Sequence, residues 1–225
     1  MNEKTEIRSG WKMARLPKIS LAGEPPASGG SNNLHRRSVY IEELGEPDRI
    51  FPGNGPDSVE ILAFRRDFSL IDPAGGGFVL LTNGMSDRRL AVPSNAGEDI
   101  KRRAELMWYV REPETNILSN LRWLAEYPFI DDTWLGFGHR IAMPWPPVSG
   151  SEFRTFLFLT PIIAPDKRIA EGLTIDNDDV AILCVHLISG MELDFIKTKG
   201  LDAFLDILDE HDYPHVFKPE RKSCV

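Results

Sequence analysis

The chain has 225 residues, of which 42% are hydrophobic and 27% are charged, a composition typical of a soluble globular protein with one sizeable core. Only two cysteines occur, which argues against a disulfide framework, and no apolar run approaches the roughly 20 residues of a membrane-spanning helix. We therefore expect a cytoplasmic protein that makes no membrane contact.

The net charge of −8 is concentrated near the C-terminus, where residues 171–225 hold 12 Asp and Glu against 5 Lys and Arg. Nucleic acids are bound mainly by basic side chains that neutralise phosphates, so this distribution argues against a nucleic-acid partner. An acidic face would favour a basic protein partner. The alternative is a solvated helix surface that only keeps the protein soluble.

The first 37 residues show no sustained periodicity. Within them, residues 21–33 are rich in small residues, Pro and Gly, which is typical of a flexible linker. We predict a flexible N-terminal extension over residues 1–37 and one domain, the body of the protein, over residues 38–225. Within the extension, Trp11 and Met13 are candidates to dock on the body.

The body is predicted to begin with a short helix from Ser38 to a C-terminal stop at Gly45. Strands are predicted at residues 59–64 and 78–82, and the turn residues between them indicate that they are neighbours in one sheet. In residues 103–110, every second side chain is apolar, and the side chains between them include both charged and apolar ones. This is the period of a strand with one mostly apolar face.

After about Pro113, apolar residues at helical spacing predict a helix whose buried face is Ile117, Leu118, Leu121, Leu124 and Ala125. A short strand is predicted at residues 140–143. Longer strands are predicted at residues 155–160 and 180–187, and because both are apolar on two sides they should be central in the sheet.

Two helices are predicted near the C-terminus. Ser189 and Glu192 have the spacing of a capping box, and Gly200 stands where that helix should end. A second helix through Leu201 and Leu208 turns acidic side chains to water. The complete pattern predicts an α+β fold, in which a mixed β-sheet packs against helices.

Few residues suggest catalysis or metal binding. His139 follows Gly136 and Gly138, where a tight turn would present its imidazole, but fixing that turn is a simpler task than acting as a general base. Cys184 and His186 lie two apart on a strand, and two ligands are too few for a structural zinc site. No CxxC, HExxH or GxSxG motif occurs, so we predict no catalytic residues, no metal and no cofactor.

The segment from Trp134 to Pro147 is rich in aromatic residues and proline, and it is the strongest candidate for an interface. The alternative is a loop that packs its aromatic side chains onto the edge of the sheet. The predicted partner-binding residues are Trp134, Phe137, His139 and Trp145 in this segment, and Asp202, Asp206 and Asp209 on the last helix.

Four blocks follow one another in a fixed order: LLTNGMSDRR at residues 80–89, RRAELMWYV at 102–110, WLGFGHRIAMPWP at 134–146 and HLISGMELDFIKTKG at 186–200. Together they resemble the suppressor of fused domain family. The residues that carry this resemblance are Thr82, Gly84, Met85, Ser86, Arg103, Ala104, Glu105, Leu106, Met107, Trp123, Leu124, Gly136, Gly138, His139, Pro161, Glu192, Leu193, Gly200 and Arg221. Most of them have a local task in closing strands, shaping turns or capping a helix.

The resemblance implies a non-catalytic protein-binding fold. Animal members look like two-lobed regulators that sequester a transcription factor, whereas bacterial single-domain members are thought to act in part as immunity proteins against toxins. This chain is more similar to the bacterial form, which implies an intracellular immunity or regulatory protein that occludes a partner protein, with a cognate toxin as one candidate. The alternatives are an enzyme with a hydrolase-type site around His139, Glu105 and Ser86, or a self-assembling structural module.

Overall fold

The computed structural model describes residues 29–210 and 214–225, except residues 54, 56–57, 74 and 98. The described strands are β1 (Arg49–Phe51), β2 (Glu60–Asp67), β3 (Gly76–Asn83), β4 (Arg103–Val110), β5 (Arg140–Ala142), β6 (Thr155–Leu159), β7 (Thr174–Ile175) and β8 (Asp178–Ile188). The described helices are α1 (Gly29–Leu44), α2 (Thr115–Ile130), α3 (Ala164–Gly172), α4 (Gly190–Lys199) and α5 (Leu201–Glu210), with a short 3₁₀ turn η1 (Met85–Asp87).

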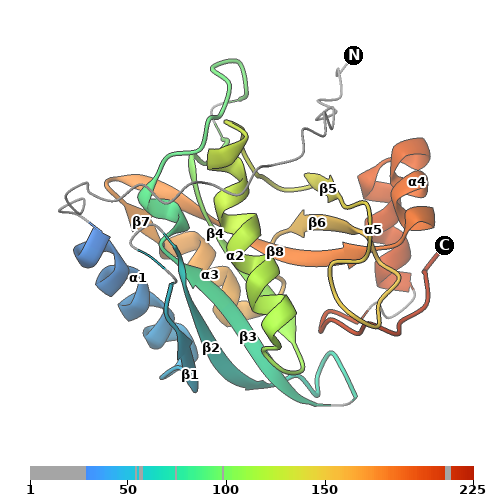
Figure 1. The fold of residues 1–225 in the computed structure, drawn as a ribbon, viewed down its shortest axis with the longest axis horizontal. Coiled ribbons are helices and arrows are strands. Elements are labelled where there is room, and N and C mark those ends of the chain that lie inside the picture. The colour runs from blue at the N-terminus through green and yellow to red at the C-terminus, as the bar shows by residue number, and fades with distance from the viewer. Residues whose placement is uncertain (1–28, 54, 56–57, 74, 98, 211–213) are drawn as a thin grey trace.

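The described strands form one mixed sheet in the order β1-β2-β3-β4-β8-β6-β5, and β7 pairs with the end of β8. The β4–β8 pair is parallel and the other pairs are antiparallel. Helix α2 lies across one face of the sheet, while α1 and α3 pack on the other face near β2–β4, and α4 and α5 pack beside β6 (Figure 1). The predicted α+β fold is confirmed.

The central strands are buried on both faces. β8 lies between β4 and β6, as its two apolar sides predicted. All eight residues of β4 are buried as well, including Arg103 and Glu105 on the side that the alternation had indicated as mixed. That side is covered by α1 and α3, so its charged groups must find partners inside the protein.

Helix α1 begins at Gly29 and not at Ser38, and it ends before Gly45, whose φ is +80°. Residues 29–37, which the sequence placed in the flexible extension, therefore form the first half of this helix. The apolar period is hidden there because the buried face carries Arg36, a polar residue with 0% exposure. The predicted docking residues Trp11 and Met13 lie outside the described residues.

Helix α2 buries the five predicted residues, and it continues through Pro128 to Ile130. Helix α3 was not predicted, because its only buried side chains are Asp166 and Ile169 and these give no apolar period. The polar stretch before β8 is a tight β7–β8 turn: Asp176 and Asn177 have φ of +50° and +63°, a conformation that Asp and Asn tolerate well.

The two C-terminal helices agree with their predictions. Ser189 and Glu192 form both hydrogen bonds of a capping box at the start of α4. Gly200 has a φ of +98°, which lets the chain turn sharply from α4 into α5. Among the described residues, no helix is both long and apolar enough to cross a membrane.

Candidate functional site

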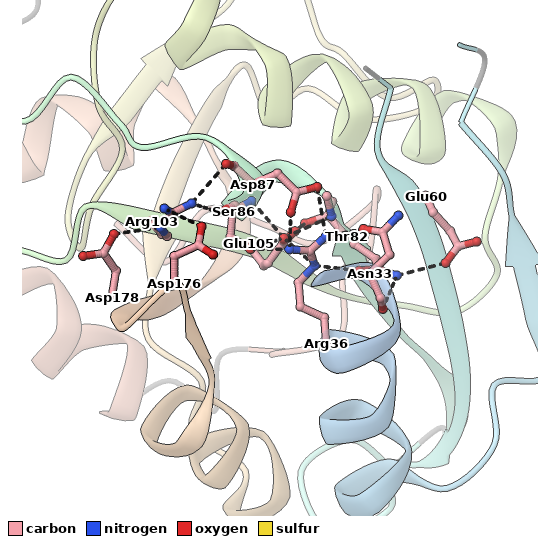
Figure 2. A network of polar contacts seen from close by, with 12 residues as sticks. Asn33, Arg36, Glu60, Thr82, Ser86, Asp87, Arg103, Glu105, Asp176 and Asp178 are labelled. Carbon is pink, nitrogen blue, oxygen red and sulfur yellow. Dashed lines mark hydrogen bonds and ion pairs between the residues drawn. The ribbon is translucent and has the colours of Figure 1, made fainter. Parts of the chain in front are cut away.

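The buried carboxylate of Glu105 is the centre of a polar network at the end of β3 (Figure 2). Its Oε2 accepts a hydrogen bond of 2.6 Å from the Thr82 hydroxyl. Its Oε1 accepts from the Ser86 hydroxyl at 2.7 Å, from the Ser86 amide at 2.9 Å and from the Gly84 amide at 3.1 Å. The chain can aim both amides at one carboxylate because Gly84 has a φ of +137° as it leaves β3.

Arg36 connects helix α1 to this carboxylate. Its Nε lies 3.4 Å from Glu105 Oε1 and donates to Asn83 Oδ1 at 2.6 Å, and its Nη1 donates to Asp87 Oδ1 at 2.8 Å (Figure 2). Burial alone would lower the pKa of Arg36, but the charges of Glu105 and Asp87 raise it above the ordinary value. The guanidinium therefore stays charged inside the protein and anchors α1 to the sheet.

Arg103 connects the same region to the β7–β8 turn. Its Nη1 donates to the Ser86 and Asp87 carbonyl oxygens at 2.7 and 3.0 Å, and its Nε donates to Asp178 at 2.8 Å (Figure 2). Hydrogen bonds from Arg89 and then from Arg103 hold the pKa of Asp178 below its ordinary value. The network thus has an arginine on each side, Arg36 and Arg103. Its hydrogen bonds and ion pairs hold α1, the β3–β4 region and the β7–β8 turn together.

The turn at Gly136–His139 is fixed to the far edge of the sheet. The Gly138 amide donates to the Phe158 carbonyl at 2.7 Å, and the Phe158 amide donates to the His139 carbonyl at 3.1 Å. The His139 ring packs edge-on against Trp134, with ring centroids 4.1 Å apart, and its Nδ1 lies 3.2 Å from the Trp134 carbonyl oxygen. Burial lowers the pKa of His139, so a neutral imidazole holds the turn.

The aromatic side chains of this segment divide into two groups. Trp134 is half-buried and packs against the core together with Met143. Phe137 and Trp145, in contrast, are 49% and 69% exposed. Packing on the sheet edge explains the first group, and only the second group is open to a partner.

The start of α5 lies next to the Gly136–His139 turn. Asp202, Asp206 and Asp209 are all exposed, and Leu201 at the start of the helix is close enough to Gly138 that a Cβ there would lie 2.7 Å from Leu201 Cδ2. The loop and the helix that were predicted separately from the sequence are therefore in contact at Gly138 and Leu201. We call Phe137, Trp145, Asp202, Asp206 and Asp209 the β5–α5 surface.

The family comparison agrees with this architecture, because the sequence profile of Suppressor of fused protein (SUFU) matches residues 55–222. The chain belongs to the suppressor of fused family. A search of curated protein sequences finds no match.

Three solved suppressor of fused structures are similar to this chain. A SUFU homolog from Neisseria gonorrhoeae has a TM-score of 0.66 at 16% identity, over 88% of this chain and 98% of that one. A chain of the Sufu–Fu complex has a TM-score of 0.58 at 15% identity, over 89% of this chain and 93% of that one. Drosophila Suppressor of Fused has a TM-score of 0.57 at 16% identity, over 90% of this chain but 52% of that one. These likenesses show a shared fold.

The remaining suppressor of fused motif residues also have structural tasks. Glu192 is fully buried, and besides capping α4 it receives two hydrogen bonds from Arg221, at 2.6 and 2.8 Å. Burial would raise the pKa of Glu192, but Arg221 and the capping amide hold it below the ordinary value. Gly136 is required because a Cβ there would lie 2.6 Å from the Trp134 ring. The motif is therefore mainly a framework for the fold.

The residues of the hydrolase alternative do not come together. Glu105 and Ser86 are in contact, but Glu105 is completely enclosed by its hydrogen-bond donors. Among the described residues, the contacts of His139 are with its own turn, with Trp134 and with β6. The described residues also contain no group of three or more His, Cys, Asp or Glu side chains arranged to hold a metal ion.

Sequence reasoning missed Arg36, Asn83 and Asp87 as members of the network. One signal was available: Asn33, Arg36 and Tyr40 are spaced three and four apart, so they share one face of a helix. A search for apolar periodicity passes over such a face because two of its three residues are polar.

Proposed function

We propose that this protein is a non-catalytic binding domain, an intracellular immunity or regulatory protein that blocks a partner protein by covering part of its surface. A cognate toxin is one candidate for that partner. The observation that carries the proposal is the β5–α5 surface, where Phe137 and Trp145 are exposed and the turn that carries Phe137 contacts the start of the acidic helix α5. Exposed large aromatic residues are the usual anchors of protein interfaces.

The turn beneath this surface is well suited to binding because it is held rigidly. Gly138 and His139 exchange backbone hydrogen bonds with Phe158 of β6, and Trp134 fixes the imidazole. A loop that is already ordered loses little conformational entropy when a partner docks on it. The exposed Phe137 is thus presented by a preorganised support.

The charge of the surface indicates a basic partner. Asp202, Asp206 and Asp209 lie along one exposed side of α5, in the most acidic part of the chain. Such a field accelerates association with a positively charged protein, and salt screens it. Membership in a family of protein-binding regulators, with a Sufu–Fu complex among its solved structures, supports the same function.

Site-specific photo-crosslinking in the native cell tests this proposal. A benzophenone amino acid replaces Phe137 or Trp145, and the matched control replaces Leu70, which is 99% exposed in the β2–β3 connection. We expect one protein to be crosslinked from positions 137 and 145 but not from position 70. That protein, once purified, should titrate at a 1:1 ratio and lose its activity when bound.

Two outcomes would contradict the proposal. Inactivation of the partner by a small fraction of one equivalent would indicate catalysis, which is the hydrolase alternative. A crosslink from position 137 or 145 to a second copy of this chain, with no other protein captured, would indicate the self-assembling module instead.

A further inference from the structure

A pocket of about 80 Å³ lies on the face of the sheet opposite α2, beside helix α5. Strands β4, β8 and β6 provide its floor, and α5, the segment after β6 and His215 provide its walls. The lining residues are Tyr109, Leu159, Thr160, Ile162, Cys184, His186, Leu205, Leu208, Asp209 and His215. No task in the proposed binding surface or in the polar network accounts for this pocket.

The polar groups on the floor are uncharged. Burial, and then the neighbouring charges of His215 and Arg221, lower the pKa of His186 to about 3. Burial, and then the charge of Asp166, raise the pKa of the Cys184 thiol. A protonated thiol is a poor nucleophile and a poor metal ligand, so the pocket is suited to binding and not to thiol chemistry.

One exposed carboxylate lies beside the pocket. Asp209 is at its exposed rim. Behind the floor, the buried Asp166 accepts hydrogen bonds of 2.6 Å from Tyr109 and from Arg66 through Oδ2, and the ion pair with Arg66 offsets its charge. A cation at the mouth of the pocket would therefore be stabilised by Asp209 alone.

We propose that this pocket receives a branched aliphatic side chain of the partner protein, and that a lysine or arginine next to that side chain contacts Asp209. The inference rests on the proposed function and specifies the partner's chemistry. A cavity of about 150 Å³ accepts benzene, so a pocket about half that size fits an aliphatic group of about four carbons but no aromatic ring. Asp209 also belongs to the β5–α5 surface, so the pocket continues that surface across α5.

Small probes test the pocket without the partner. The probes are 3-methylbutylammonium, neutral 3-methylbutanol and 3-methylbutanoate, titrated into the full chain while the imidazole signals of His186 and His215 are followed by NMR. We expect the ammonium to bind about three- to ten-fold more tightly than the alcohol, and the carboxylate to bind most weakly. Equal affinity for the three probes, or no shift of these signals, would overturn the proposal.

Two pairs of variants localise the effect. Thr160→Phe should fill the mouth of the pocket and abolish probe binding, whereas Thr198→Phe, at an exposed position of α4, should not. Asp209→Asn should remove the preference for the ammonium over the alcohol, whereas Asp194→Asn, the same change on α4, should keep it. Because Asp209 is exposed, the second pair remains informative even where Thr160→Phe fails to fold.

The partner identified by crosslinking provides the final test. Thr160→Phe should weaken its binding at least ten-fold, and Thr198→Phe should leave it unchanged. A partner that binds Thr160→Phe as tightly as the wild type would overturn the pocket proposal alone. If the probes bind as expected but crosslinking captures no partner, the proposed function fails, and with it the partner side chain as the occupant.

Discussion

Charged side chains are buried where β3 ends beside β4, in the middle of the sheet, but exposed at the edge of the sheet near β5 and α5. In the β3–β4 region, Arg36 and Glu105 are fully buried, and each is surrounded by hydrogen-bond partners. At the β5–α5 end, the carboxylates of α5 are exposed, and the start of α5 contacts the turn that carries the exposed Phe137. Charge therefore holds elements together in one region and is presented to the surroundings in the other.

The difference follows from what covers each region. Helix α1 closes over the β3–β4 region, so any charge there must be paired, and breaking one pair leaves an uncompensated buried ion. The β5–α5 end finishes in a short edge strand that no further strand covers among the described residues. Substitutions in the first region should therefore affect stability, and those in the second should affect binding.

Glu105→Ala is the strongest test of the buried region. It removes the acceptor of four hydrogen bonds and leaves Arg36 without its central counter-charge, so we expect a loss of about 3–5 kcal/mol in the free energy of unfolding. Urea unfolding followed by circular dichroism measures this loss. Glu171→Ala, at an exposed position of α3, is the control and should change stability by no more than about 0.5 kcal/mol. A loss below about 1 kcal/mol for Glu105→Ala would contradict a stabilising network.

Arg36→Met tests whether α1 is an integral part of the domain. We expect a loss of about 2–4 kcal/mol, because the side chain bonds to Asn83 and Asp87 and neutralises Glu105. The adjacent Arg37 forms a partly exposed ion pair with Glu60, so Arg37→Met should cost at most about 1 kcal/mol. If urea unfolding shows an equal loss of stability for the two variants, the burial of Arg36 does not increase its contribution to stability.

The burial of His186 on the pocket side of the sheet should make the stability of the protein depend on pH. The pKa of His186 is about 3 in the folded protein, below its ordinary value of 6.5, so the unfolded chain takes up the proton first. Stability is therefore complete above pH 6.5 and decreases as the pH falls toward about 3, by up to about 1.4 kcal/mol per pH unit from this group.

His186→Leu should remove that part of the pH dependence, whereas His35→Leu, on the exposed side of α1, should not. Denaturant unfolding at several pH values between 4 and 7 measures the difference. A common slope for the wild type and His186→Leu would contradict the burial of a neutral imidazole.

Substitutions on the β5–α5 surface should change the stability of the protein least. Replacing both Phe137 and Trp145 with Ser should change the free energy of unfolding by no more than about 0.5 kcal/mol, because both side chains are largely exposed. The same change should weaken partner binding by about 2 kcal/mol or more in calorimetry. Trp134→Ala is the contrast, since it removes packing against the core and should lower stability. Unchanged partner binding in the double variant would remove this surface from the interface.

Local patterns in the sequence predicted the elements with strong periodicity or specific caps. The apolar spacing from Ile117 to Ala125 gave the buried face of α2, and Ser189 with Glu192 gave the start of α4. Each of these signals works because the interacting residues are near one another in the chain. The segment from Trp134 to Pro147 was identified as a whole, but composition did not separate the half-buried Trp134 from the exposed Trp145.

By itself, the sequence determined the α+β class, the buried face of α2, the burial of β8 on both sides and the acidic character of the C-terminal helix, because these follow from local periodicity and composition. Only the tertiary structure decided that Arg36 meets Glu105, and that the Gly138 turn meets the start of α5. These residues are far apart in the chain. The sequence around a polar side chain does not indicate whether a helix will cover it in the folded protein. The burial of one set of charges and the exposure of the other, which we propose to be the basis of function, are properties of the assembled sheet.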